Sequence, residues 1–227
     1  MNDVFFVGAY WNARREILED VIQPTLEVLE RLSEFDEQFL TFYELGYSRK
    51  SALENKVLLN VENIKELYKK GHKKKDIDSF GYSGVGFNLS LWTGQRDRES
   101  SSLSFRVGKN SDKVSNSCLI SLPAEGVAKD RLLHFNKAKI ILDLLIEAWD
   151  PDTVVLTSRK LSDSLTAITD VGWMTYKKLL EKNVRVIDNI IHDPYYKGGH
   201  LFYLKTNNEM AYDYDMIDDL LSFKKNL

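Results

Sequence analysis

Three short apolar runs decide the fold class of this chain: GFNLSLW at 86–92, SLSFRV at 102–107 and SCLISL at 117–122. Connectors rich in glycine, serine and charged residues separate the runs, which is the usual spacing of short strands. They predict an antiparallel meander. A fourth run at 4–10, rich in β-branched and aromatic residues and stopped by Trp11 and Asn12, predicts a buried opening strand.

Two long stretches have the apolar spacing of amphipathic helices, and their apolar faces need a sheet to cover them. The first runs from Arg14 to Leu32, and Pro24 should kink or interrupt it because proline lacks a backbone donor. The second runs over 129–149 and stops at Asp150 and Pro151. The apolar positions are Ile17, Val21, Ile22, Leu26, Leu29 and Leu32 in the first helix, and Leu132, Leu133, Ala138, Ile141, Leu142, Leu145 and Ile146 in the second.

Shorter elements complete the prediction. Ser48 and Asn60 are expected to cap two peripheral helices, and 35–43 fits either a strand or a helical turn. Further strands are predicted at 153–157, 185–190 and 201–204, and further helices near 176–180 and at 216–223. Because strands and helices mix without strict alternation, we expect an α+β fold. It would be a single domain over 1–227, with a mixed, mostly antiparallel sheet packed by two long helices.

Composition restricts the classes of function. The 227 residues carry a net charge of −3, which provides no overall attraction to DNA or anionic lipid. A single cysteine, Cys118, excludes an intrachain disulfide and suits a reducing compartment. No apolar run is long enough to span a bilayer, and the N-terminus has no signal-peptide pattern. We therefore expect a cytoplasmic protein that does not bind membranes.

The chain has no strong catalytic motif. The glycines Gly81, Gly84 and Gly86 lead into a strand, whereas a phosphate-binding loop opens a helix. The four histidines lack metal-ligand spacing, and Cys118 lies in a predicted strand as a small buried group. The pair Pro151–Asp152 resembles the start of a nuclease motif, but no convincing second half follows. We predict no catalytic residue, no metal and no cofactor.

Two charged segments stand out. The stretch 65–75 has six lysines against Glu66, which fits a solvated helix end or, less simply, a nucleic-acid contact. The stretch 209–219 has acids and tyrosines without any lysine or arginine. Helix capping would explain its last acids, and a face for a basic partner would explain the whole segment. The candidate partner-binding residues are Glu209, Tyr212, Asp213, Tyr214, Asp215, Asp218 and Asp219.

Four short segments follow one another along the chain: YWxxR after the first strand, SRKxAL, LWTG and VGWMTY. Together they resemble landmarks of the immunity protein 52 family of bacterial polymorphic toxin systems. Asn12 stands where the family pattern has glycine, and asparagine tolerates a left-handed backbone better than other residues with a side chain. The motif residues are Tyr10, Trp11, Arg14, Ser48, Arg49, Lys50, Trp92, Gly94, Gly172, Trp173 and Tyr176.

The resemblance implies a cytosolic, non-catalytic α+β antidote that binds and neutralises a cognate toxin, commonly a restriction-endonuclease-like nuclease. We expect a monomer or weak homodimer that binds no nucleic acid. Two alternatives remain open at this stage. One is a small hydrolase or nucleotide-handling enzyme with a site assembled in space from residues such as Arg14, Asp76, Asp78, His192 and Asp193. The other is a nucleic-acid-binding module that uses 65–75.

Overall fold

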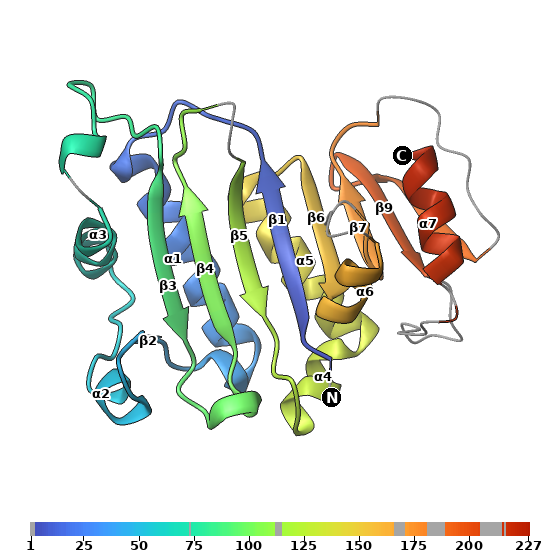
Figure 1. Cartoon of the computed structure of the whole chain (residues 1–227), viewed down its shortest axis with the longest axis horizontal. Helices are drawn as coiled ribbons and strands as arrows, with labels where there is room; N and C mark the ends of the chain where they lie inside the picture. The colour runs from blue at the N-terminus through green and yellow to red at the C-terminus, as the bar shows by residue number, and fades with distance from the viewer. Residues whose placement is uncertain are drawn as a thin grey trace.

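The structure is a computed structural model that describes residues 3–72, 74–111, 115–165, 171–180, 189–204, 215 and 217–227. Nine strands within these residues form one sheet, in the order β2-β3-β4-β5-β1-β6-β7-β9-β8 (Figure 1). Every strand pairing is antiparallel, so the mostly antiparallel α+β prediction is confirmed. The strands are β1 (Phe5–Trp11), β2 (Tyr43–Glu44), β3 (Phe87–Trp92), β4 (Ser102–Val107), β5 (Asn116–Ser121), β6 (Thr153–Ser158), β7 (Met174–Lys177), β8 (Ile190–Tyr196) and β9 (Gly199–Leu204).

The helices differ from the prediction at several boundaries. They are α1 (Leu18–Phe35), α2 (Arg49–Leu53), α3 (Val61–Lys70), α4 (Val127–Leu133), α5 (Phe135–Trp149), α6 (Arg159–Ser164) and α7 (Ile217–Asn226), with short 3-10 turns at Glu37–Phe39, Lys74–Asp76 and Asp97–Glu99. The predicted caps Ser48 and Asn60 do accept hydrogen bonds from the first turns of α2 and α3. Helix α1 begins four residues after Arg14 and continues through Pro24. Of the predicted kink or interruption at Pro24, the interruption is therefore wrong.

The second long helix is also two helices rather than one. His134 has an extended backbone, with φ −60° and ψ 136°, and separates α4 from α5. The predicted helix near 176–180 is wrong, because Met174–Lys177 instead forms β7 between β6 and β9. The undecided 35–43 contains a 3-10 turn and the first residue of β2. Most of the predicted strand at 185–190 lies outside the described residues.

Alternate residues of the central strands build the core. Val7 pairs with Ile120 and Leu156, and all three are fully buried in the core. Helix α5 packs against β1 and β6, and α1 lies beside it on the same side of the sheet (Figure 1). Neighbouring residues of a strand point to opposite faces of the sheet. The residues that alternate with the buried ones along each strand therefore form the other face. Cys118 belongs to the buried face, where burial raises the pKa of its thiol. The sheet therefore has one face covered by the long helices.

The opposite face is covered only in part. Phe202 of β9 packs on Phe223 of α7, with ring centroids 4.8 Å apart, whereas the adjacent Tyr203 packs on Phe135 of α5. Helices α5 and α7 therefore lie on opposite sides of β9. Helix α6 packs against β6. Among the described helices, none lies over β3, β4, β5 and β1 on this side, so that these four strands have an open face (Figure 1).

Candidate functional site

The YWxxR segment joins the end of β1 to the end of α5. Trp11 is buried and stacks on Trp149, with ring centroids 5.0 Å apart. The Arg14 guanidinium lies 5.6 Å from the Trp11 ring and donates hydrogen bonds to the backbone carbonyls of Trp149, at 2.7 Å, and Asp150. These carbonyls lie at the C-terminal end of a helix and lack intrahelical partners. A cation at this position also stabilises the helix, because the C-terminus is the negative end of the helix dipole. Arg14 therefore fastens the C-terminus of α5.

Asn12 contributes through its backbone rather than through a left-handed conformation. Its φ is not positive. Its N–H donates to the Asp152 carboxylate at 2.9 Å, and its carbonyl accepts from the buried Asn116 side chain at 3.0 Å. The backbone N–H of Asp152 also donates to the carbonyl of Tyr10. Asp152, considered above as the start of a nuclease motif, instead holds this corner of the sheet together.

The SRKxAL and LWTG segments meet near β2 and β3, at one edge of the sheet. Ser48 caps α2, and Arg49 donates to the carbonyl of Gly94 at 3.1 Å. Gly94 has φ +84°, and a Cβ there would lie 2.6 Å from the Tyr43 ring, so no other residue fits without movement. The indole N–H of Trp92 donates to the carbonyl of Glu44 at 3.3 Å. Lys50 is exposed on α2.

The VGWMTY segment enters β7. A Cβ at Gly172 would lie only 2.2 Å from the carbonyl oxygen of Leu156 in β6, so the two backbones approach too closely for any side chain. Trp173 and Tyr176 are both buried and both belong to the core. The four motif segments thus hold strands and helix ends together at three places, and their buried members cannot contact a partner directly.

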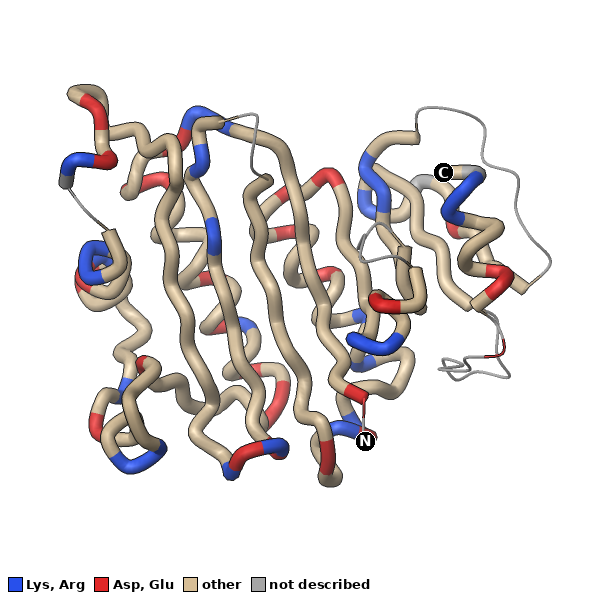
Figure 2. The backbone as a smooth tube through the Cα atoms, in the orientation of Figure 1, with Lys and Arg blue, Asp and Glu red and all other residues tan. Residues whose placement is uncertain are grey.

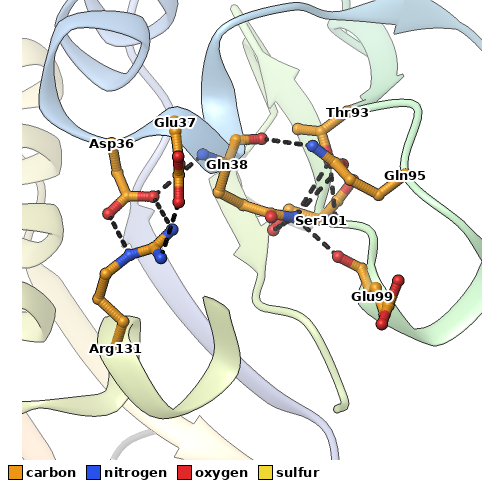
Figure 3. A network of polar contacts seen from close by, with 8 residues as sticks. All are labelled: Asp36, Glu37, Gln38, Thr93, Gln95, Glu99, Ser101 and Arg131. Atoms are coloured by element: carbon orange, nitrogen blue, oxygen red, sulfur yellow. Dashed lines mark hydrogen bonds and ion pairs between the residues drawn. The ribbon is translucent and has the colours of Figure 1, made fainter. Parts of the chain in front are cut away.

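A polar network that the sequence did not reveal fixes the C-terminal end of α1, at its cap residue Asp36 (Figure 3). Arg131 of α4 donates two hydrogen bonds to Asp36, whose side chain is 4% exposed, and pairs with Glu37 at 2.9 Å. The amide of the buried Gln38 donates to the carbonyl of Glu99 at 2.9 Å and reaches the Ser101 hydroxyl at 3.2 Å. The network joins α1 and α4 to the β3–β4 connection.

The residues of the alternative enzyme site do not form one cluster. Asp78 accepts backbone hydrogen bonds from Phe80 and Tyr82, whereas Arg14 is engaged at the end of α5. His192 stacks on Phe202 and lies 3.2 Å from His200, and burial followed by the neighbouring His200 lowers its pKa. No three histidine, cysteine or acidic residues of the described chain are placed to hold a metal ion.

The acidic segment is described only at its end. Glu209, Tyr212, Asp213 and Tyr214 lie outside the described residues. Asp218 and Asp219 occupy the first turn of α7, where acids stabilise a helix, and Asp219 accepts a hydrogen bond from Asn189 at 2.8 Å. Asp215 and Asp218 are exposed. The helix-start explanation therefore accounts for Asp218 and Asp219, and it does not reach Glu209 or Asp213.

The open face is a surface that sequence reasoning missed. Its outward positions form three rows across β3, β4, β5 and β1, set by the strand register. The rows are Asn88, Arg106, Ser117 and Tyr10; Ser90, Ser104, Leu119 and Gly8; and Trp92, Ser102, Ser121 and Phe6. Arg106 is the only charged residue in these four strands, and Figure 2 shows charge gathered elsewhere, at strand ends and on helices.

Tyr10 and Trp92 are the motif aromatics that reach the open face. Both are half-buried, in contrast to the buried Trp11 and Trp173. A Cβ on Gly8 would lie 2.5 Å from the Tyr10 hydroxyl, so the Tyr10 side chain lies along the strand over Gly8. The open face therefore shares two residues with the motif segments.

Comparison with known proteins identifies the family. The family model for Immunity protein 52 matches residues 3–187, which include all four motif segments. No curated protein matches the chain. No described helix is long and apolar enough to cross a membrane. With most of its 227 residues matched, the chain belongs to the immunity protein 52 family.

Proposed function

We propose that this chain is an intracellular antidote that binds a cognate toxin and neutralises it in a stoichiometric complex, without catalysing a reaction. The family match over residues 3–187 carries the proposal. The packing of the motif residues supports it, because Arg14, Arg49 and Gly172 hold the scaffold rigid rather than assemble a reactive site. A rigid surface loses little entropy on binding.

The toxin that we propose is a nuclease of the restriction-endonuclease type, and the compartment is the cytoplasm. A lone cysteine that is buried in the sheet suits a reducing compartment, where a nuclease toxin would meet its substrate. The chain would act as one unit over 1–227, as a monomer or weak homodimer.

The acidic segment 209–219 remains a proposed contact for a basic surface of the toxin. Nuclease surfaces that bind DNA are basic, and complementary charge speeds association. Glu209 and Asp213 are the acids that carry this proposal, because helix-start stabilisation and the contact with Asn189 account for Asp218 and Asp219.

The test uses the toxin domain encoded by the reading frame next to this chain's gene. We expect the toxin domain to degrade plasmid DNA in vitro and the purified chain to stop this degradation at one equivalent. Half an equivalent should leave half of the nuclease activity, because each antidote molecule occupies one toxin molecule. Full inhibition by a small fraction of an equivalent would instead indicate an enzymatic antidote and contradict the proposal.

A further inference from the structure

The open face has a composition unlike that of a solvated surface. One of its twelve outward positions is charged, whereas 29% of the residues of the whole chain are charged. The centres of protein interfaces are depleted of charge and enriched in tyrosine, tryptophan, phenylalanine and arginine. The face has one of each, at Tyr10, Trp92, Phe6 and Arg106.

The remaining positions strengthen the comparison with interfaces. Five of the twelve are serines, and the others include Asn88 and Gly8. Antibody paratopes are rich in tyrosine, serine, glycine and asparagine, with tryptophan and arginine at the strongest contacts. The small hydroxyl groups of serine provide adaptable hydrogen bonds there. Strand stability alone would favour β-branched residues at these positions. Strand propensity therefore does not account for the five serines, whereas a contact of the paratope kind would use them.

Arg106 indicates the chemistry of that partner. It is exposed on β4, in an outer row of the open face, between Asn88 on β3 and Ser117 on β5. Its guanidinium has no hydrogen bond or ion pair with any described residue, and the four strands around it contain no acid. A guanidinium binds a carboxylate through two parallel hydrogen bonds, which gives both affinity and orientation.

Other occupants fit this face poorly. Nucleic acid or an anionic membrane would need several cations on the surface, and the four strands supply one. A second copy of this chain docked through the same face would bring a second Arg106 and no carboxylate to the contact, because the four strands contain no acid. Like charges in such a contact oppose association. A different folded protein with a carboxylate at its contact surface meets none of these objections.

We propose that the open face of β3, β4, β5 and β1 is a docking surface for the cognate toxin, and that a toxin carboxylate binds Arg106. This inference rests on the proposed antidote function and assigns its principal interface. It is separate from the acidic segment 209–219, which would meet a basic part of the same partner.

Two aromatic side chains give the face a preformed shape. The Tyr10 side chain lies over Gly8, where even a methyl group would displace it. Trp92 is anchored at the far corner by its hydrogen bond to Glu44, beside the Tyr43 ring at 6.1 Å. Aromatics that are already fixed lose little conformational freedom on binding, so they are efficient contact residues.

The first experiment reverses the single charge. The probe is the toxin domain from the neighbouring reading frame, made inactive by substitution in its own active site, and the readout is the Kd from calorimetry. We expect Arg106→Glu to weaken binding at least about 100-fold and Arg106→Gln about tenfold, since reversal adds repulsion to the lost ion pair. Lys75→Glu is the matched control, because Lys75 is exposed away from the face, and its Kd should stay within about twofold of wild type.

The second experiment adds bulk without charge. Ser90→Trp places a large side chain on an exposed position of the face, and strands tolerate tryptophan well. It should weaken binding at least about 30-fold by steric exclusion, whereas Ser79→Trp, exposed outside the four strands, should not. Circular dichroism checks that every variant is folded.

The outcomes separate the two proposals. If wild type fails to bind the toxin domain, the antidote function and this inference both fall. If wild type binds and both Arg106→Glu and Ser90→Trp bind within threefold of it, the antidote function stands and the open face is not the interface.

Discussion

Arg131 holds Asp36 with two hydrogen bonds, Nε to Oδ2 at 2.9 Å and Nη2 to Oδ1 at 2.7 Å, across 95 positions of the sequence. Asp36 also accepts from the backbone N–H of Gln38 at 3.0 Å, so one carboxylate caps a 3-10 turn and anchors α4 (Figure 3). Because the Asp36 side chain is nearly inaccessible, these bonds are worth more than an exposed ion pair.

We expect Asp36→Asn to lower the free energy of unfolding by about 2–3 kcal/mol. The asparagine has nearly the same shape, but its amide places a donor against the Arg131 guanidinium. Glu125→Gln is the matched control, because Glu125 pairs with Arg98 at 2.9 Å on the surface, where loss of a pair costs less than about 1 kcal/mol. Urea unfolding at pH 7 measures both, and equal small losses would show that the Asp36 contact is unimportant.

The same contact predicts a pH dependence. Burial alone would raise the pKa of Asp36, but the hydrogen bonds from Arg131 and Gln38 outweigh it and hold the pKa below its ordinary value. A carboxyl with a lowered pKa stabilises the fold fully above the unfolded pKa of about 4, and this stabilisation is lost as the pH falls through the folded pKa. The difference in unfolding free energy between wild type and Asp36→Asn should therefore be constant from pH 7 to about pH 5 and shrink below pH 4. A difference that grows on acidification would contradict the assignment.

Gly172→Ala tests the close approach of two backbones. The new Cβ would meet the carbonyl oxygen of Leu156 at 2.2 Å, and a backbone atom in a central strand cannot move aside cheaply. We expect a loss of at least about 2 kcal/mol, which lowers the Tm by about 4–8 °C. Gly84→Ala is the control, since nothing lies within 4 Å of its Cβ position. Its Tm should remain unchanged or rise slightly. Similar effects of the two substitutions would refute the steric argument.

Elements with a strong local signal were predicted well from sequence. The meander at β3, β4 and β5 and the caps Ser48 and Asn60 agree with the structure to within about one residue. The break at His134 was missed because Leu133 and Ala138, on either side of it, are both buried and the apolar pattern continues across. Strand β7 was mistaken for helix because its hydrogen bonds come from β6 and β9, and tertiary pairing overrides local propensity.

The open face required the register of the sheet. Ser90, Ser104 and Leu119 lie in different strands, and only their pairing brings them into one row. The alternation of apolar and polar residues in 87–92 and 102–107 predicts which positions face outward. A tabulation of those positions alone would have shown that Arg106 is the only charged residue among them. The contact between Asp36 and Arg131 has no comparable local signal.

Arg14→Ala tests the structural role that the contacts assign to Arg14. The carbonyls of Trp149 and Asp150 would lose their donor, and Asp150 already has a left-handed backbone with φ 44°. We expect a loss of about 2 kcal/mol in unfolding free energy, with toxin binding unchanged in the folded fraction. Arg15→Ala, which removes only an exposed contact with the Tyr82 ring at 5.3 Å, should cost about 0.5 kcal/mol. Unchanged stability with lost protection would place Arg14 in the interface instead.

The acidic segment is tested by charge reversal at acids that precede α7, because helix capping does not contribute to the result there. Glu209→Lys with Asp213→Lys changes two acids that precede α7 in the sequence, and the matched control is Asp218→Lys, which changes an exposed acid in the first turn of that helix. If 209–219 faces a basic toxin surface, the double variant should associate about tenfold more slowly at low ionic strength, because long-range attraction controls the association rate. Its rate should also depend less on salt than the wild-type rate does.

The control Asp218→Lys should lose stability, because a cation in the first turn is unfavourable to the helix dipole, and it should change the association rate less. Stopped-flow measurements from roughly 20 to 500 mM salt, which span weak to strong screening, follow both effects. If wild type and double variant associate at equal rates at low salt, Glu209 and Asp213 are solvated residues that do not contact the toxin. The open face around Arg106 would then be the remaining candidate for the interface.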